Sequence, residues 1–465
     1  MRQEQDFLGS MPIPPAAYWG VHTARAIENF PITGHTVGQM PALVRAFAYV
    51  KKAAAQANLE LAVIGEPQAG AIVRACDDLI AGALHGEFVV DVIQGGAGTS
   101  TNMNANEVIA NRALEHLGLE RGRYDVVHPN DHVNASQSTN DTYPTAVKLA
   151  TYFGMQQLQE ALAALRGAFT AKAREFDAVL KVGRTQLQDA VPMTLGQEFD
   201  AFASMIADDE KRLRESAYLM CEINMGGTAI GTGINAPVGY AQRVTERLAQ
   251  CSGVPVQLAA NLIAATSDTG AFVDISGLLK RIAAKLSKIS NDLRLLSSGP
   301  QAGVGDIRLP ARQAGSSIMP GKVNPVIPEV VNQVCFEVIG NDVAITMAAE
   351  AGQLQLNAFE PLMAWALHKS LQHLVRACQT LQLHCVEGIV ANQELLTERI
   401  AASVTLVTAL NPLIGYEKSA AIAKAAIASG KPIAQVAEDL GIMSRSEMQA
   451  LLVAERLTQV GALRA

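Results

Sequence analysis

The chain has 465 residues, 49% of them hydrophobic and 17% charged, which indicates a globular protein larger than one ordinary domain. The formal net charge is −7 and Lys and Arg form no long run, so a nucleic-acid-binding surface is not expected. No stretch of 18 apolar residues occurs, so no membrane-spanning helix is expected either. Aromatic residues make up only 5% while Ala and Leu are abundant, and this balance favours helix over strand.

The six cysteines lie far apart in the chain, and none forms a Cys-x-x-Cys pair. The first twenty residues are polar and then Pro-rich, without the basic and apolar regions of an export signal. We therefore expect reduced, mostly buried thiols and a cytoplasmic protein.

Three domains are predicted along the chain. Residues 1–140 read as short helices mixed with Gly-rich and Asn-rich loops and form the N-terminal domain. Residues 141–390 carry the long helical patterns of a central domain, with helices predicted across 157–176 and 193–219. Residues 391–465 read as a small C-terminal domain of short helices. Its predicted breaks are Asn411-Pro412, Gly430-Lys431-Pro432 and Gly441.

Two apolar seams mark further long helices in the central domain. From Leu279 to Leu296, apolar residues recur at alternating spacings of three and four, and Gly299-Pro300 should end that helix. A second seam runs from Leu367 to Cys385. Long helices with such seams pack side by side, so a helical bundle is predicted. The seams favour a bundle shared between subunits, and a large monomeric bundle is the alternative.

Three polar loops are candidates for chemistry: Gly95–Asn102, Ser136–Asp141 and Gly315–Pro325. Each offers hydroxyls and backbone N–H groups near a helix start, an arrangement that binds anions. Lys322 adds a positive charge and Asn324 an amide, so together the loops could hold a small dicarboxylate. Taken singly, each loop is more simply explained as a helix cap or a turn.

Other catalytic classes find little support in the sequence. No phosphate-binding Gly-x-x-x-x-Gly-Lys-[Ser/Thr] motif or dinucleotide-binding motif is present. His-Glu-x-x-His and Gly-x-Ser-x-Gly are also missing, which disfavours zinc and serine-hydrolase chemistry. His22, His128 and His132 could act as bases, although a single loop histidine is more often structural.

The third loop, Gly-Ser-Ser-Ile-Met-Pro-Gly-Lys-Val-Asn-Pro, resembles the signature of the aspartase/fumarase superfamily. The other two loops and the segment Gly183–Ala190 resemble further segments of that superfamily, and the resemblance covers nearly the whole chain. It implies a mainly all-α fold of three domains with a long central bundle. It also implies a homotetramer with a twenty-helix core, in which three subunits build each active site.

Several positions resemble the aspartase branch more than class II fumarases. Val326–Val330 follows the signature loop as in aspartases, and Ala351–Asn357 leads into Phe359-Glu360-Pro361. Gln186 stands where fumarases and some aspartases carry a histidine, which in fumarases is tied to their water chemistry. The resemblance therefore implies reversible deamination of L-aspartate to fumarate and ammonia. The alternatives are a class II fumarase, another amino-acid ammonia-lyase, or a non-catalytic structural relative like the lens proteins of this superfamily.

The resemblance also implies a role for each site residue. Ser316 is the general base, and Thr99, Ser138, Thr139 and Ser317 hold the substrate β-carboxylate. Lys322 and Asn324, with Thr185, hold the α-carboxylate, while Asn140 places the ammonium group. Residues 315–324 form a lid, whose further members are Gly315, Ile318, Met319, Pro320 and Gly321.

No organic cofactor and no catalytic metal are implied. Some relatives are activated by a divalent metal or by aspartate at a second site, and no pattern in this sequence marks one. Because Gln186 replaces the usual histidine, a His–Glu pair with Glu329 cannot form. Either another group protonates the leaving amine, or ammonia leaves already protonated.

Overall fold

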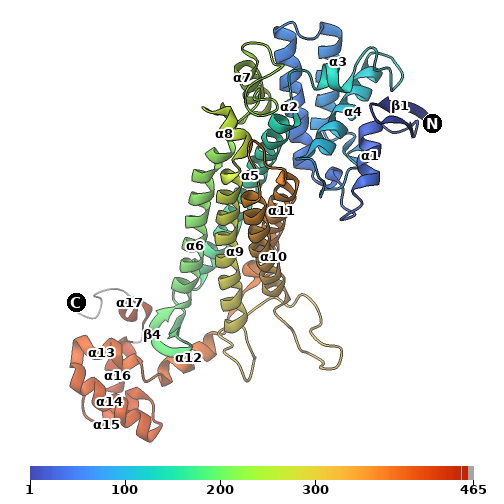
Figure 1. Cartoon of the computed structure of the whole chain (residues 1–465). Coiled ribbons are helices and arrows are strands. Elements are labelled where there is room, and N and C mark those ends of the chain that lie inside the picture. Colours follow the sequence, from blue (N-terminus) through green and yellow to red (C-terminus); the bar gives the residue numbers. More distant parts are fainter. Residues whose placement is uncertain (452, 459–465) are drawn as a thin grey trace. The chain divides into compact units, whose positions relative to one another are not determined.

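The computed structural model describes residues 1–451 and 453–458, and it confirms the mainly all-α fold (Figure 1). The chain divides into two compact units. The first comprises Met1–Gln159, Arg212–Arg281 and Phe336–Leu374, and the second comprises Glu160–Lys211, Ile282–Cys335 and Val375–Ala465. The three-domain division expected from the sequence stays a prediction.

Unit 1 contains six complete helices and four short strands. The helices are α1 (Val21–Asn29), α2 (Pro41–Glu60), α3 (Glu66–Ile80), α4 (Thr99–His116), α7 (Tyr240–Ser252) and α8 (Leu262–Ser267). The strands form an antiparallel pair, β1 (Arg2–Asp6) with β2 (Gly9–Ile13), and a parallel pair, β5 (Glu222–Ile223) with β6 (Gln257–Leu258). The prediction of short helices before residue 140 is wrong, because α2 and α4 span 20 and 18 residues.

Five long helices contribute residues to both units. They are α5 (Thr139–Glu175), α6 (Leu195–Ser216), α9 (Gly270–Leu296), α10 (Val326–Glu350) and α11 (Glu360–His384). The predicted seam from Leu279 lies on α9, where Leu279, Ile282 and Leu293 are fully buried. The seam that begins at Leu367 lies on α11, and its last residue, Cys385, directly follows the helix. Both seam predictions are confirmed, and α9 ends before Gly299-Pro300 as expected.

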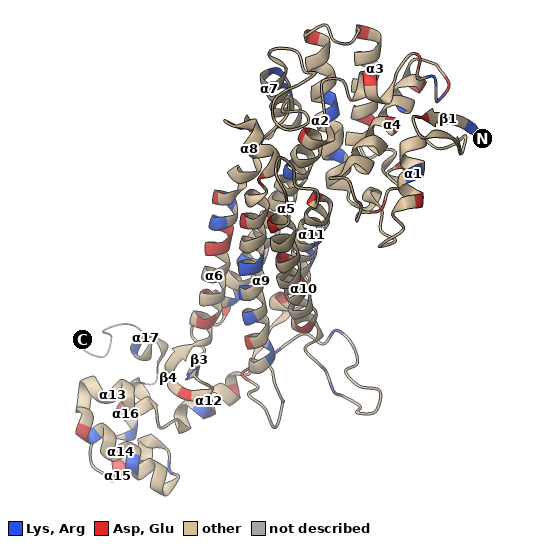
Figure 2. Cartoon of the chain, in the orientation of Figure 1, with Lys and Arg blue, Asp and Glu red and all other residues tan. Residues whose placement is uncertain are grey.

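Charged residues of both signs lie along the long helices (Figure 2). Some of their side chains form ion pairs between helices. In unit 2, Lys285 of α9 approaches Asp208 of α6 at 2.9 Å. In unit 1, Lys280 of α9 and Ser276 both bind Asp342 of α10, at 2.6 and 2.8 Å. Because Asp342 is buried, its two partners fix the register of α9 against α10 in unit 1.

The rest of unit 2 contains two antiparallel strand pairs, of which β3–β4 is a hairpin, and short helices. Strand β3 (Leu180–Thr185) pairs with β4 (Gln188–Thr194), and β7 (Ile307–Arg308) pairs with β8 (Val390–Ala391), both antiparallel. The helices are α12 (Gln393–Ala402), α13 (Leu406–Ile414), α14 (Tyr416–Ser429), α15 (Ile433–Asp439), α16 (Arg445–Leu451) and α17 (Ala454–Leu457).

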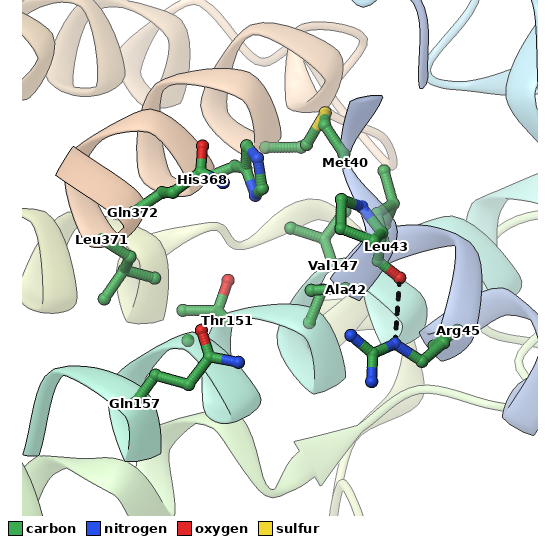
Figure 3. Close-up of a pocket in the computed structure, with 14 residues that line it drawn as sticks. Met40, Ala42, Leu43, Arg45, Val147, Thr151, Gln157, His368, Leu371 and Gln372 are labelled. Atoms are coloured by element: carbon green, nitrogen blue, oxygen red, sulfur yellow. Dashed lines mark hydrogen bonds between the residues drawn. The ribbon is translucent and has the colours of Figure 1, made fainter. Parts of the chain in front are cut away.

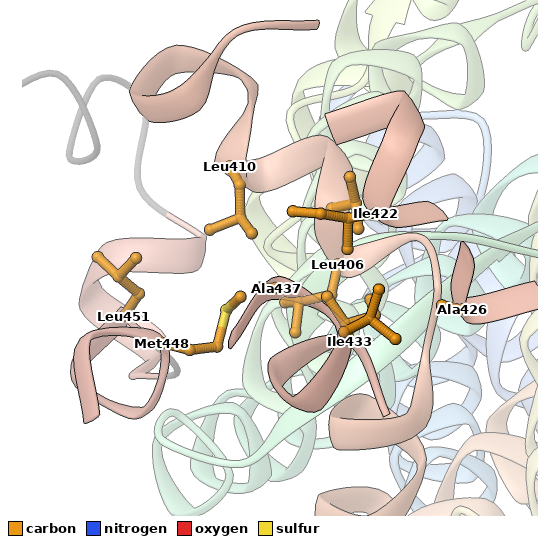
Figure 4. Close-up of a cluster of buried hydrophobic side chains, with 10 residues drawn as sticks. Leu406, Leu410, Ile422, Ala426, Ile433, Ala437, Met448 and Leu451 are labelled. Atoms are coloured by element: carbon orange, nitrogen blue, oxygen red, sulfur yellow. The ribbon is translucent and has the colours of Figure 1, made fainter. Parts of the chain in front are cut away.

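Helices α13 to α16 share a separate apolar core (Figure 4). Leu410, Ile422 and Ala437 are fully buried in it. Its helices end at Gly430 and before Gly441 as predicted. The predicted break at Asn411-Pro412 is wrong: α13 continues through Pro412 to Ile414. Burial of Leu406, Val407 and Leu410 outweighs the hydrogen bond that proline cannot donate.

Among the described residues, no helix is both long and apolar enough to cross a membrane.

Candidate active site

The first polar loop turns sharply into α4, and its glycines make that turn possible. Gly96, Ala97 and Gly98 all have positive φ, from 55° to 88°. A Cβ at Gly98 would lie 2.2 Å from the ring of Tyr143, so only glycine fits there. Thr99 is the first residue of α4 and is exposed, with its hydroxyl donating to the Gly96 carbonyl at 2.7 Å.

The second polar loop is held by a buried carboxylate. Asp141 is fully buried, and its Oδ1 accepts from the Ser138 backbone N–H at 3.0 Å. Its Oδ2 accepts from the backbone N–H groups of Gly226 and Thr228, both at 3.0 Å. Burial raises the pKa of Asp141, although these hydrogen bonds act in the opposite direction. Asp141 thereby fixes the start of α5 to the 226–228 loop.

A hydrogen-bonded network joins the first two loops inside unit 1. Asn102 of α4 donates to the Thr139 hydroxyl of α5 at 3.1 Å, and also to Asn134 Oδ1 at 3.1 Å. The buried Lys51 of α2 donates to Asn134 and to Gln137, each at 2.9 Å. Desolvation lowers the pKa of Lys51 to about 7. The Thr139 hydroxyl is therefore fixed in position by its hydrogen bond from Asn102 of α4.

Asn140 depends on a proline placed inside α5. Pro144 has no N–H, so the carbonyl of Asn140 four residues earlier lacks its helical partner. Asn224 supplies the missing donor, with its amide 3.0 Å from that carbonyl. The Asn140 side-chain amide donates to the Ala229 carbonyl at 2.7 Å. Its side-chain oxygen accepts no hydrogen bond from the described residues.

The two ends of the predicted lid, residues 315–324, are hydrogen-bonded to each other within unit 2. The Gly315 N–H donates to the Lys322 carbonyl at 2.8 Å, and the Asn324 amide donates to the Gly315 carbonyl at 2.8 Å. A Cβ at Gly315 would lie 2.4 Å from the Lys322 carbonyl oxygen, so a residue with a side chain would clash there. Gly321 has a φ of 81° at the far turn. Ile318 and Met319 between them are exposed.

Ser316 has a distinctive environment inside that loop. Its Oγ accepts from the backbone N–H groups of Ile318 and Met319, at 3.2 and 3.0 Å. Two N–H donors aimed at one hydroxyl oxygen stabilise negative charge on it. Ser317 and Lys322 are exposed on the same loop.

Thr185 is exposed at the end of β3, at the tip of the β3–β4 hairpin. The next two residues, Gln186 and Leu187, have φ values of 54° and 62° and make the tight turn. Gln186 is exposed at that tip. The hairpin displays both Thr185 and the glutamine that replaces the fumarase histidine.

The predicted site residues are divided between the two units. Thr99, Ser138, Thr139 and Asn140 belong to unit 1, where Asn102 and Asn134 link their loops. The second group belongs to unit 2 and comprises Thr185, Gly315, Ser316, Ser317, Ile318, Met319, Pro320, Gly321, Lys322 and Asn324.

Sequence reasoning missed the residues that hold these loops. Lys51 and Asn134 lie outside the loops and carry no motif of their own, and Asp141 was predicted only as a member of the second loop, without a role. A signal for Asp141 was present, because a Ser with an Asp three residues later resembles a capping box. His128 and His132 serve as local caps: each ring accepts from nearby backbone N–H groups.

Unit 1 also contains a cavity of about 70 Å³ between α2, α5 and α11 (Figure 3). None of the predicted site residues lines it. His368 faces it, and burial lowers the pKa of His368 to about 4, so this ring is neutral at physiological pH. The remaining lining is largely apolar, and the cavity offers no acid or base suited to proton transfer at neutral pH.

Among the described residues, no group of three or more His, Cys, Asp and Glu side chains is arranged to hold a metal ion. The anion-binding capacity of the two groups rests instead on hydroxyls, amides, backbone N–H groups and Lys322.

Comparisons with known proteins show which family the chain resembles. A family model described as lyase matches residues 9–340, and one described as fumarase C C-terminus matches residues 406–459. An aspartate ammonia-lyase from Pseudomonas aeruginosa is 56% identical over 98% of this chain and 96% of its own. A fumarate lyase/delta crystallin structure from Brucella melitensis, bound to cobalt, has a TM-score of 0.94 and 59% identity over 97% of this chain and 98% of that one. A class II fumarase structure from Schistosoma mansoni has a TM-score of 0.91 and 35% identity over 97% and 98%.

The chain therefore belongs to the aspartase/fumarase superfamily of lyases. Within that superfamily it is more similar to the aspartate ammonia-lyase from P. aeruginosa, at 56% identity, than to the fumarase from S. mansoni, at 35%.

Proposed function

We propose that the protein is an aspartate ammonia-lyase, which converts L-aspartate reversibly to fumarate and ammonia. The observation that carries this proposal is the Ser316 loop, whose two N–H donors suit a basic oxygen, in a chain 56% identical to a named aspartate ammonia-lyase. The chemistry begins with removal of a proton from Cβ of aspartate. The C–N bond then breaks, and ammonia leaves.

The proton on Cβ is weakly acidic, so the site must stabilise the charge that its removal creates. That charge spreads into the neighbouring β-carboxylate as an aci-carboxylate. Donors aimed at that carboxylate supply the largest effect. Thr99, Ser138, Thr139 and Ser317 are suited to this task, because hydroxyls concentrate dipoles in little volume.

Ser316 takes the Cβ proton as its alkoxide. A serine hydroxyl is ordinarily far too weak an acid to ionise near neutral pH, so the oxyanion needs strong support. The N–H groups of Ile318 and Met319 provide part of it. The Lys322 ammonium on the same loop adds a favourable charge.

The other end of the substrate is held by separate groups. Lys322 and Asn324, with Thr185, bind the α-carboxylate, and the free side-chain oxygen of Asn140 accepts from the ammonium group. These roles need no organic cofactor and no catalytic metal. Dialysis against a chelator should leave basal turnover unchanged, and a loss restored by added Mg²⁺ would contradict this.

Residues 315–324 act as a lid that closes over bound aspartate and expels water. Two glycines at its ends and exposed Ile318 and Met319 at its centre support that role. Exclusion of water would strengthen the donors around the β-carboxylate. Hydrogen exchange across 315–324 should slow when aspartate binds, and unchanged exchange would rule the lid out.

The protein assembles as a homotetramer through its long helices. Phe336, Val343 and Met347 of α10 are 61%, 58% and 67% exposed in the single chain, and their spacing places them on one face. A stripe of large apolar side chains on a long helix is typical of a surface covered by another subunit.

The protein works in the cytoplasm. All six cysteines, which lie among the described residues, are free thiols, and five of them are buried. Free thiols are typical of a reducing compartment.

The direct test is the ultraviolet absorbance of fumarate formed by purified protein from L-aspartate, and separately from L-malate. Fumarate from aspartate alone is the expected result. Fumarate from malate alone would identify a fumarase, and no fumarate from either would favour a structural relative.

A further inference from the structure

One buried carboxylate in unit 2 gathers three cations and takes no part in the chemistry proposed above. Asp306 is 0% exposed, and its Oδ2 lies 2.7 Å from Arg184 Nη1 and 3.3 Å from Lys181 Nζ. Its Oδ1 lies 2.8 Å from Arg399 Nη1. Lys181 is shared with Glu198 at 2.6 Å. A buried charge persists only when such partners surround it.

The three cations come from elements that are far apart in the sequence. Lys181 and Arg184 belong to β3, and Arg184 immediately precedes Thr185. Arg399 lies on α12, in the C-terminal part of the chain. Asp306 itself immediately precedes β7, which continues toward the lid.

Backbone contacts reinforce the same junction. The Asp306 carbonyl accepts from the Asn392 N–H at 3.0 Å, and β7 pairs with β8 directly before Asn392. The Asn392 side chain also donates to the Gly305 carbonyl, and Arg399 donates to the Val304 carbonyl. The strand leading to the lid is therefore joined to α12 by both side chains and backbone.

Arg184 has little else to hold it in place. Its other acidic neighbour, Asp189, is 4.0 Å away and 62% exposed, so that contact is weak. Without Asp306, the end of β3 would lose its main anchor. Thr185 at the hairpin tip is exposed and gains no support of its own from packing.

We propose that Asp306 is a positioning residue for substrate binding. It holds the Thr185 hairpin at a fixed place relative to the strand that leads to the lid, and Arg399 couples α12 to this arrangement. The inference rests on the proposed function, because it assigns Thr185 to the substrate α-carboxylate. Loss of the junction should weaken ground-state binding of aspartate more than the chemical step.

The experiment removes the ion pair between Arg399 of α12 and Asp306. Arg399 is one-third exposed, and its loss leaves Asp306 paired with Lys181 and Arg184. Arg399→Gln should raise KM for aspartate about fivefold or more with kcat within about twofold of wild type. Arg399→Lys should restore much of the loss. Lys431→Gln, which breaks an exposed pair with Asp439 on α15, is the matched control and should leave KM unchanged.

A double-mutant cycle separates positioning from general destabilisation. Thr185→Val alone should raise KM, and Arg399→Gln should add little to it if Arg399 acts through Thr185. Fully additive effects on KM, or an Arg399→Gln variant that melts earlier with unchanged KM, would overturn the proposal.

Hydrogen exchange gives a readout that does not need activity. Amides across 180–194 should exchange faster in Arg399→Gln than in Lys431→Gln, and equal exchange would overturn the positioning role. If wild-type protein forms no fumarate from aspartate, the proposed function fails, while hydrogen exchange still decides whether this junction holds the hairpin.

Discussion

The hydroxyls of Ser316 and Ser317 are neighbours in sequence but differ in their surroundings. Ser316 Oγ accepts from two backbone N–H groups, whereas Ser317 is exposed on the loop. Sequence resemblance predicted the roles of both residues. It could not predict the two donors, because they depend on how residues 316–319 fold back on themselves.

Ser316→Ala should lower kcat by about 10²–10⁴-fold with little change in KM, because it removes the base and leaves the carboxylate donors in place. Ser317→Ala is the comparison and should lower kcat less, because three other hydroxyls still hold the β-carboxylate. Steady-state formation of fumarate measures both. Equal losses of kcat in the two variants would contradict the assignment of the base to Ser316.

Glu360 at the start of α11 is one residue whose charge state should contribute to the pH dependence of stability. It is 2% exposed, its Oε2 has no hydrogen-bond partner among the described residues, and burial raises its pKa to about 8. The folded protein therefore binds this proton more tightly than the unfolded chain, whose carboxyl has the ordinary value of 4.5. Stability should fall as pH rises from 4.5 toward 8 and then level off.

Glu360→Gln should remove the fall in stability that Glu360 causes between pH 4.5 and 8, because glutamine resembles the protonated acid. The melting temperature of the variant should match that of the wild type near pH 5 and exceed it near pH 8. A constant difference across this range would show that Glu360 does not titrate in the folded protein.

At the level of elements, the entry into α4 depends on a close approach between glycine and an aromatic ring. Gly96 and Gly98 have almost the same φ, 87° and 88°, but differ in the space around them. The nearest atom to a Cβ at Gly96 is 3.8 Å away, whereas at Gly98 the Tyr143 ring is 2.2 Å away. This pair therefore separates backbone strain from steric overlap.

Gly96→Ala should cost about 1–2 kcal/mol from the left-handed backbone alone. Gly98→Ala should cost about 1–3 kcal/mol more, because the ring of Tyr143 must move. Thermal unfolding of the two variants measures the difference. Equal destabilisation of the two variants would mean that the Tyr143 ring can move away from the new Cβ without lowering the free energy of unfolding.

The sequence predicted some helices well and others poorly, for identifiable reasons. The α9 and α11 seams are regular, so their period was visible. Helix α5 starts at Thr139, far before the predicted residue 157. It contains Pro144, and the donor that replaces the missing N–H is the distant Asn224, which no local sequence pattern marks. Helix α10 has apolar residues on all sides, so no single seam marked it.

At the scale of the whole molecule, the exposed apolar side chains of α10 are left largely uncovered by the described residues of a single chain. The loops of unit 1 and the lid of unit 2 each carry only part of the proposed chemistry. The resemblance predicted a site shared by three subunits, and that remains a prediction. Sequence alone could not reveal which α10 residues face outward, because exposure depends on how α9 and α11 pack against it.

Phe336→Glu should break the tetramer and reduce activity with it, because a charge would be buried in the apolar contact. Light scattering after size-exclusion chromatography measures the mass. Ile427→Glu, on an exposed position of α14, is the control and should remain tetrameric. A fully active monomer of Phe336→Glu would refute a site shared between subunits.

We expect the site to add or remove an amine and not water. Fumarate supplied together with ammonium tests this, because both nucleophiles then compete in one sample, and proton nuclear magnetic resonance follows the products. Aspartate is the expected product, with no malate. Malate as the main product would contradict this expectation and identify the protein as a hydratase.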